Sequence, residues 1–185
     1  MSIILASQSP RRRELMEKAG FEIEIRPSDA DENIEFNGNP GEYVCKLAEI
    51  KGDAVKSDKG DIVLSADTIV TIDGEILGKP HSPMEAVEML RKLSGRTHSV
   101  YTGCCIRKDE GKEIFYEKSD VTFFELSDEE IQSYVASGEP FDKAGGYGIQ
   151  GKGCILVEKI VGDYYNIVGL PIAKVYQYIK KEIES

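Results

Sequence analysis

Along this chain, segments with the periodicity of strands alternate irregularly with segments that have the periodicity of helices. Residues 62–72 form a long apolar β-run. Asp73-Gly74 directly after it is a typical two-residue hairpin turn, leading into Ile76 and Leu77. Hairpins and helix-connected strands therefore occur in the same chain. This combination predicts an α/β fold with a mixed sheet, not a strict βαβ repeat.

Capping signals mark the starts of several expected helices. Ser9 and Pro10 have the residue types preferred at the N-cap and at the first helical position. Ser82 and Ser127 each stand three residues before a glutamate, which is the pattern of a capping box. The expected helices are 10–20, 40–56, 83–95, 128–138 and one from 171 onward. The expected strands are 3–6, 22–26, 62–72, 97–107, 113–126 and 154–159.

The length of 185 residues predicts one domain, 1–185, built with two lobes. Apolar residues make up 41% and charged residues 30%, as is usual for a soluble globular protein. The first apolar run has only four residues, so it indicates neither a secretory signal nor a membrane span. Because the four cysteines show no CxxC spacing, we interpret them as reduced thiols of a cytoplasmic protein.

The formal net charge of -10 opposes binding to a nucleic-acid backbone, for which a domain normally presents a basic face. Any site for an anionic substrate must therefore be built locally, against the field of the whole protein. The positions of the lysines and arginines become the main guide to such a site.

The run Ser7 to Arg13 concentrates positive charge at the start of a helix. Three arginines fall in the first turn, where the helix macrodipole is positive and cations are disfavoured. An anion bound by the free backbone N–H groups and the guanidinium groups would explain the arrangement. The alternative is a solvated patch whose arginines pair with acidic residues. The local physics favours the anion site.

Asp67 interrupts the apolar β-run 62–72. A carboxylate buried there would be badly desolvated, so such a residue is usually paired, bound to a metal or poised as a base. The alternative is an acid in a bulge or turn that reaches water or a neighbouring lysine. The residue pattern alone supports both interpretations equally.

Two lysines and an acidic stretch are weaker candidates. Lys51 lies four residues after Leu47, on the apolar face of its helix, and Lys79 follows the Asp-Gly hairpin. Either lysine could simply extend its ammonium to solvent, which is the better explanation for each one taken alone. The stretch 29–32, which ends at Glu32, would suit Mg²⁺, although a solvated acidic loop explains it better.

The glycine-rich segment 146–152 formally matches both GxGxxG and GxxxxGK. Either motif requires a helix afterwards, whereas the run 154–157 predicts a strand, so both nucleotide-binding interpretations are rejected. What remains is a backbone that can approach a ligand closely and that carries Gln150, whose amide both donates and accepts. A tight multi-turn connection is the alternative. His81 and His98 are interpreted as surface or strand residues.

Six blocks of the sequence, in the same order, resemble the Maf family of nucleoside triphosphate pyrophosphatases. They span almost the whole chain, so the resemblance is specific. The blocks are LASQSPRRREL at 5–15, SADTIV at 65–70, LGKP at 77–80, LSGRTHSVYTG at 93–103, GEPFDKAGGYGIQG at 138–151 and GDYYNIVGLP at 162–171.

The resemblance implies an α/β fold with a mixed, twisted sheet flanked by helices and with two lobes around a central cleft, related to the inosine-triphosphate-pyrophosphatase architecture. It implies cleavage between the α- and β-phosphates with a divalent metal cation, Mg²⁺ or Mn²⁺. One subgroup of the family prefers dTTP and UTP, and another prefers 7-methyl-GTP. Thr68 and Gln150 in this chain resemble the first subgroup.

The resemblance also implies roles for individual residues. Asp67 takes the position of the proton acceptor. The specificity positions are taken by Arg11, Thr68 and Gln150. The expected phosphate-binding residues are Ser7, Arg12, Lys51 and Lys79, and the expected metal ligands are Glu32 and Asp67.

The expected partner is a small-molecule nucleoside triphosphate, with no nucleic acid and no membrane, and a homodimer is a further hypothesis. One rival function is a nucleotide-sensing regulator of cell division or septum formation. A pure sensor gains nothing from Asp67, since a carboxylate repels phosphates. A second rival, nucleic-acid binding, is opposed by the net charge and by the lack of a basic-aromatic stripe.

Overall fold

The computed structural model describes residues 1–184, which form two compact units. Unit 1 consists of Met1–Asp67, Thr102–Glu117 and the segment from Gly169 onward. Unit 2 consists of Thr68–Tyr101 and Lys118–Val168. The single domain expected from the chain length stays a prediction.

A mixed sheet of seven strands runs through the described residues in the order β2-β1-β3-β5-β6-β7, with β4 paired to β3. β1 pairs in parallel with both β2 and β3, whereas the pairs β3–β4 and β6–β7 are antiparallel. The mixed sheet expected from the sequence is therefore confirmed. The strands are β1 (Ile3–Leu5), β2 (Ile23–Ile25), β3 (Ile62–Ile72), β4 (Glu75–Leu77), β5 (Thr97–Lys108), β6 (Gly111–Phe123) and β7 (Val157–Val161).

The helices that the sequence predicts begin at or next to the expected residue. The helices are α1 (Pro10–Lys18), α2 (Pro40–Ala54), α3 (Pro83–Leu93), α4 (Asp128–Ala136), α5 (Tyr164–Val168) and α6 (Ile172–Glu184). Ser127 and Glu130 form the complete capping box of α4. At α3, Ser82 Oγ accepts from the N–H of Glu85, but the Glu85 carboxylate accepts from the N–H of His81 instead of closing the box. None of the helices within 1–184 combines the length and the apolar character that crossing a membrane requires.

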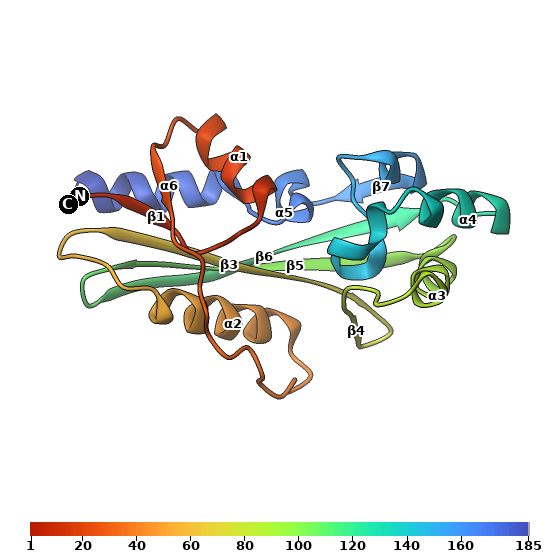
Figure 1. The fold of residues 1–185 in the computed structure, drawn as a ribbon, viewed down its shortest axis with the longest axis horizontal. Coiled ribbons are helices and arrows are strands. Elements are labelled where there is room, and N and C mark those ends of the chain that lie inside the picture. Colours follow the sequence, from red (N-terminus) through yellow and green to blue (C-terminus); the bar gives the residue numbers. More distant parts are fainter. Residues whose placement is uncertain (185) are drawn as a thin grey trace. The chain divides into compact units, whose positions relative to one another are not determined.

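In unit 1, helices cover both faces of the sheet, with α2 on one face and α1 and α6 on the other (Figure 1). Strands β1 and β3 are buried along the parallel pair, where Ile4, Leu5 and Leu64 have no exposed surface. The hydroxyl of Ser65 on β3 donates to the carbonyl oxygen of Ala48, at 2.6 Å, and so fixes α2 on the strand.

In unit 2, α3 and α4 pack around a core that also takes side chains from the strands and the glycine-rich segment. Leu90, Phe123, Ile131 and Tyr147 are buried in this core. His98 is buried with them, and its Nε2 lies 2.7 Å from the hydroxyl of Tyr147. His98 is therefore a strand residue, as expected, but it is not on the surface.

Two expected strand boundaries were wrong, and one helix was not expected. The strand expected over 154–159 begins only at Val157, because Lys152–Leu156 forms a 3₁₀ helix first. The strand expected to end at residue 126 ends at Phe123, because the N–H of Leu126 donates to the hydroxyl of Ser94, the C-cap residue of α3, and not to a neighbouring strand. Helix α5 was not expected, and it follows Asp163, whose carboxylate accepts from the N–H of Tyr165.

Candidate active site

The connection between β1 and α1 gathers polar groups at the start of the helix. Ser9 Oγ caps α1 by accepting from the N–H of Arg12, at 3.4 Å. The Arg12 guanidinium donates to Ser7 Oγ at 3.1 Å and to the carbonyl oxygen of Gly169 at 2.8 Å. The positive end of α1 and a fixed guanidinium thus border the same loop, which is the arrangement that the anion-site hypothesis requires.

Lys51 joins two carboxylates that come from different segments of unit 1. Its Nζ lies 2.6 Å from Asp67 Oδ1 and 3.0 Å from Glu32 Oε2. The Lys51 and Asp67 side chains are 13% and 15% exposed, whereas that of Glu32 is 52% exposed. Lys51 therefore does not extend to solvent, and Asp67 is paired instead of isolated. The geometry brings together three of the residues that the resemblance singles out.

The alternation of β3 explains how Asp67 meets Lys51. Ser65 and Asp67 are two residues apart and so project from the same face of the strand. Ser65 bonds to Ala48 of α2, and Lys51 lies one helical turn further along that helix. Gly52 allows the close approach, because a Cβ at this position would lie 2.8 Å from Ser65 Oγ.

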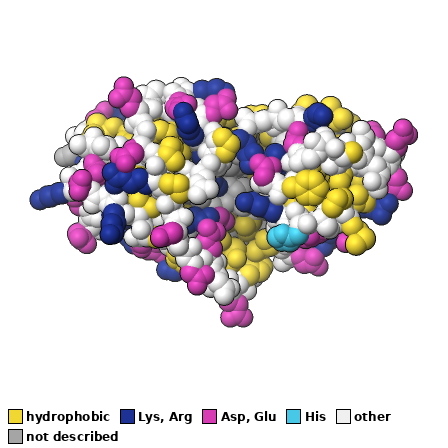
Figure 2. All heavy atoms as spheres, in the orientation of Figure 1, with side chains coloured by type: hydrophobic (Ala, Val, Ile, Leu, Met, Phe, Trp, Pro, Cys, Tyr) yellow, Lys and Arg dark blue, Asp and Glu magenta, His cyan; other side chains and the backbone are white. Residues whose placement is uncertain are grey.

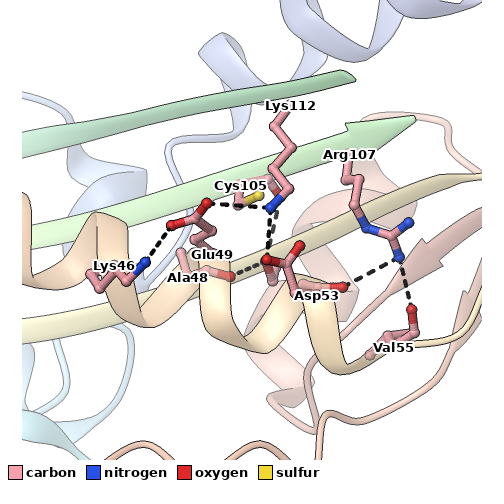
Figure 3. Close-up of polar contacts among 10 residues, drawn as sticks. Lys46, Ala48, Glu49, Asp53, Val55, Cys105, Arg107 and Lys112 are labelled. Atoms are coloured by element: carbon pink, nitrogen blue, oxygen red, sulfur yellow. Dashed lines mark hydrogen bonds and ion pairs between the residues drawn. The ribbon is translucent and has the colours of Figure 1, made fainter. Parts of the chain in front are cut away.

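Polar contacts hold the C-terminal half of α2 against β5 and β6 (Figure 3). Lys112 bridges Glu49 and Asp53, with distances from its Nζ of 3.3 and 2.7 Å. The Arg107 guanidinium donates to the carbonyl oxygen of Val55, at 2.8 Å. These contacts fix the turn of α2 that carries the central lysine of the site.

The charges of unit 1 act on one another electrostatically. Burial lowers the pKa of the Arg12 guanidinium, whereas Asp67 and Glu32 raise it and Arg11 lowers it. Both arginines are half-buried. Unit 1 therefore combines two guanidinium groups and the Lys51 ammonium with two carboxylates. Such a set of side chains can neutralise phosphates and also hold a water molecule or a cation.

Thr68, Lys79 and Gln150 belong to unit 2. Thr68 is a half-buried residue of β3, whereas Lys79 and Gln150 are exposed. The segments that carry the last two are in contact, because the N–H of Gly145 donates to the carbonyl oxygen of Gly78, at 3.0 Å. The phosphate-binding and specificity roles expected of these three residues stay predictions.

The Maf-like protein family model matches residues 2–182. The chain belongs to the Maf-like protein family. The resemblance drawn from its six sequence blocks is thereby confirmed. This Maf-like chain is 55% identical to a dTTP/UTP pyrophosphatase of Bacillus cereus, over 97% of this chain and 94% of the relative. It is 54% identical to a dTTP/UTP pyrophosphatase of Bacillus anthracis, with the same coverage.

Among solved structures, the Maf-like chain is similar to a HAM1 protein from Coxiella burnetii. The TM-score is 0.54 at 17% identity, and the match covers 98% of this chain and 99% of the other. Identity at this level shows the fold alone. The mixed α/β architecture expected from the resemblance is confirmed.

The residues of unit 1 fit a divalent cation that arrives with phosphates. Asp67 and Glu32 direct carboxylate oxygens at one point, the ammonium of Lys51. Residues 1–184 contain no group of three or more histidine, cysteine or acidic side chains that could hold a metal ion. Mg²⁺ often takes only one or two carboxylates and completes its shell with substrate phosphates and water. The two carboxylates suit that mode of binding.

Three groups that hold candidate residues in place were not singled out from the sequence. The carbonyl oxygen of Gly169 fixes Arg12, and Tyr134 and Glu139 hold the segment that carries Gln150. Gly169 and Glu139 lie within the blocks that resemble the family, which was the only signal for them.

Proposed function

We propose that this Maf-like protein hydrolyses nucleoside triphosphates, above all dTTP and UTP, to the nucleoside monophosphate and pyrophosphate. Two lines support the proposal: relatives with this activity in their name match almost the whole chain at 55% and 54% identity, and unit 1 contains the required charges. The contact that carries it is the Asp67–Lys51 pair, because it places a half-buried carboxylate among cations. The homodimer and the cytoplasmic location stay predictions.

In this proposal Arg12 and Lys51 bind phosphate oxygens, and the resemblance implies the same role for Lys79. Ser7 would hold the Arg12 guanidinium in place and offer its hydroxyl to the same phosphates. Asp67 would accept the proton of a water molecule that attacks the α-phosphorus. The bond from the α-phosphorus to the bridging oxygen breaks, and pyrophosphate leaves with its charge spread over the cations.

The divalent cation would be held by Glu32 and Asp67. When bound, Mg²⁺ or Mn²⁺ would neutralise phosphate oxygens and offset the charge that develops on the leaving pyrophosphate. In the structure, Lys51 holds the same two carboxylates. If these carboxylates hold the cation, Lys51 would be free to bind the phosphates instead.

The products provide the direct test. We expect dTTP and Mg²⁺ to yield dTMP and pyrophosphate, because the family cleaves next to the α-phosphorus. Ion-exchange chromatography of the reacted nucleotide distinguishes these products from dTDP and orthophosphate. The second pair as main products would contradict the proposal, and tight nucleotide binding without turnover would favour the sensing alternative.

Gln150 is expected to recognise the pyrimidine edge. Its exposed amide offers a donor and an acceptor, which match the O4 acceptor and the N3–H donor of thymine and uracil. Gln150→Ala should cost about 1–3 kcal/mol of transition-state binding for dTTP, as measured by kcat/KM. Nucleotides that do not use the contact should lose less.

Gln132→Ala is the matched control, since Gln132 is an exposed glutamine of the same unit, on α4. It should leave the kcat/KM of every nucleotide unchanged. If Gln150→Ala lowered kcat/KM equally for dTTP and for purine triphosphates, Gln150 would not carry specificity.

A further inference from the structure

A single carboxylate holds the exit of the turn that carries Gln150. Glu139 Oε2 accepts from the N–H of Lys152 at 2.8 Å, and Glu139 Oε1 accepts from the N–H of Gly153 at 3.2 Å. Glu139 Oε1 also accepts from the hydroxyl of Tyr134, at 3.0 Å. Both carboxylate oxygens are thus directed into the glycine-rich segment and not to solvent.

Tyr134 extends this contact to the other end of the turn. Its hydroxyl accepts from the N–H of Gly148, at 3.0 Å, while donating to Glu139. Tyr134 is buried, with 4% exposure. The hydroxyl therefore links the entry of the turn to the same carboxylate that holds its exit, and Gln150 lies exposed between the two.

The glycines of the turn let the carboxylate sit directly beneath the backbone. A Cβ at Gly151 would lie 2.4 Å from Glu139 Oε2. A Cβ at Gly153 would lie 2.5 Å from the carbonyl oxygen of Gly148. A side chain at either position would clash and displace the turn from Glu139. The contact between the turn and the glutamate therefore requires these glycines.

The charge of Glu139 suits this role. Burial alone raises the pKa of its carboxyl, but the hydrogen bonds from the N–H groups of Lys152 and Gly153 and from Tyr134 outweigh it, so the pKa is lowered. Hydrogen bonds to an ionised acceptor are stronger than those between neutral groups. A carboxylate is therefore a better anchor for this turn than an amide of the same shape.

We propose that Glu139 is a positioning residue for substrate recognition: through its contacts with Lys152 and Gly153, and through Tyr134 with Gly148, it holds the turn so that Gln150 meets the base of the nucleotide. This inference rests on the proposed function, because it assigns Glu139 a role through Gln150. Glu139 itself touches neither the base nor the phosphates in this scheme.

The test compares Glu139→Gln with Glu158→Gln, a matched control that removes the same charge from an exposed position of β7. Glu139→Gln keeps the size of the side chain, but its amide can turn a donor toward a backbone N–H. Tyr134→Phe is a second variant that removes the link to Gly148. Each protein is assayed with dTTP and dGTP. Amide hydrogen exchange of residues 148–153 is followed without nucleotide.

We expect Glu139→Gln to lower kcat/KM for dTTP about tenfold more than for dGTP, and Tyr134→Phe to act in the same direction. Exchange of the amides at 148–153 should be faster in both variants and unchanged in Glu158→Gln. Added to Gln150→Ala, Glu139→Gln should lower kcat/KM for dTTP little further, because the two residues act through one contact.

Equal losses for dTTP and dGTP, or losses that add fully in the double variant, would overturn the positioning role. Unchanged hydrogen exchange in Glu139→Gln would overturn it as well. A wild-type protein that shows no preference for dTTP over dGTP would instead contradict the proposed substrate. The exchange experiment needs no nucleotide, so it distinguishes that failure from a failure of the Glu139 anchor.

Discussion

Asp67→Asn is expected to lower the turnover of dTTP by about 10²- to 10⁴-fold, which is the usual contribution of a general base. Asparagine keeps the shape of the side chain but removes its negative charge and its basicity. In the structure Asp67 pairs with Lys51 at 2.6 Å. That pair places the carboxylate beside a group that would bind the phosphates of the substrate. Steady-state kinetics at saturating Mg²⁺ measures the loss.

The same substitution should leave the protein folded. Lys51 keeps a second carboxylate partner in Glu32, at 3.0 Å, so no unpaired ammonium remains in the half-buried site. The melting temperature of Asp67→Asn should therefore stay close to that of the wild type. Affinity for dTTP without metal should hold or improve, because one negative charge near the phosphates has been removed.

Asp61→Asn is the matched control. Asp61 directly precedes β3 and is buried, with its carboxylate accepting from the N–H groups of Ser2 and Asp58 at 2.7 and 3.1 Å. It should lower the melting temperature and leave turnover per folded molecule unchanged, the reverse of Asp67→Asn. A well-folded Asp67→Asn protein with turnover near that of the wild type would remove the central residue of the proposed mechanism.

Local signals predicted most of the secondary structure because each one acts over a few residues. The N-cap at Ser9, the capping box at Ser127 and the Asp73-Gly74 turn all form as their residue types require. The strand expected from residue 154 did not form there, because a contact between residues that are distant in the sequence acts on this segment. The backbone N–H groups of Lys152 and Gly153 bind Glu139, 13 and 14 positions earlier in the sequence, and this contact favours a 3₁₀ turn over a strand.

The candidate site was predictable only in part. The spacing on α2 and the alternation on β3 identified Lys51 and Asp67 separately, but the sequence did not show that they pair, since they lie 16 positions apart. The bond from Arg12 to Gly169 spans 157 positions. No local pattern reports such a contact. The resemblance supplied the set of residues, and the fold supplied the contacts between them.

The charges in the sequence predicted that an anion site exists, but not how its side chains are arranged. The net charge of -10 argued for a locally built anion site. On the face shown in Figure 2, Lys and Arg side chains are interspersed with Asp and Glu. The local concentration at the start of α1 could be expected from three consecutive arginines. Only the structure showed that Arg12 turns back onto its own loop.

His98 should make the stability of the protein depend on pH. Its Nδ1 is buried without a hydrogen-bond partner within residues 1–184, and its ring packs edge-on against Phe123, with ring centroids 5.0 Å apart. Burial lowers the pKa of His98 from 6.5 to about 4, with Asp120 acting in the opposite direction. Between about pH 4 and pH 6.5, the unfolded chain therefore binds a proton on His98 that the folded chain excludes.

The stabilising effect of a neutral His98 is thus fully present above about pH 6.5 and is lost as the pH falls toward about 4. The loss by about pH 4 amounts to about 3 kcal/mol of the free energy of unfolding. His98→Gln places an uncharged amide near the position of Nε2 and keeps a partner for Tyr147. Urea unfolding at several pH values should show a flatter dependence for this variant, whereas exposed His81→Gln should follow the wild type. Parallel pH curves for His98→Gln and the wild type would show that His98 titrates alike in the folded and unfolded states, and that its burial does not exclude the proton.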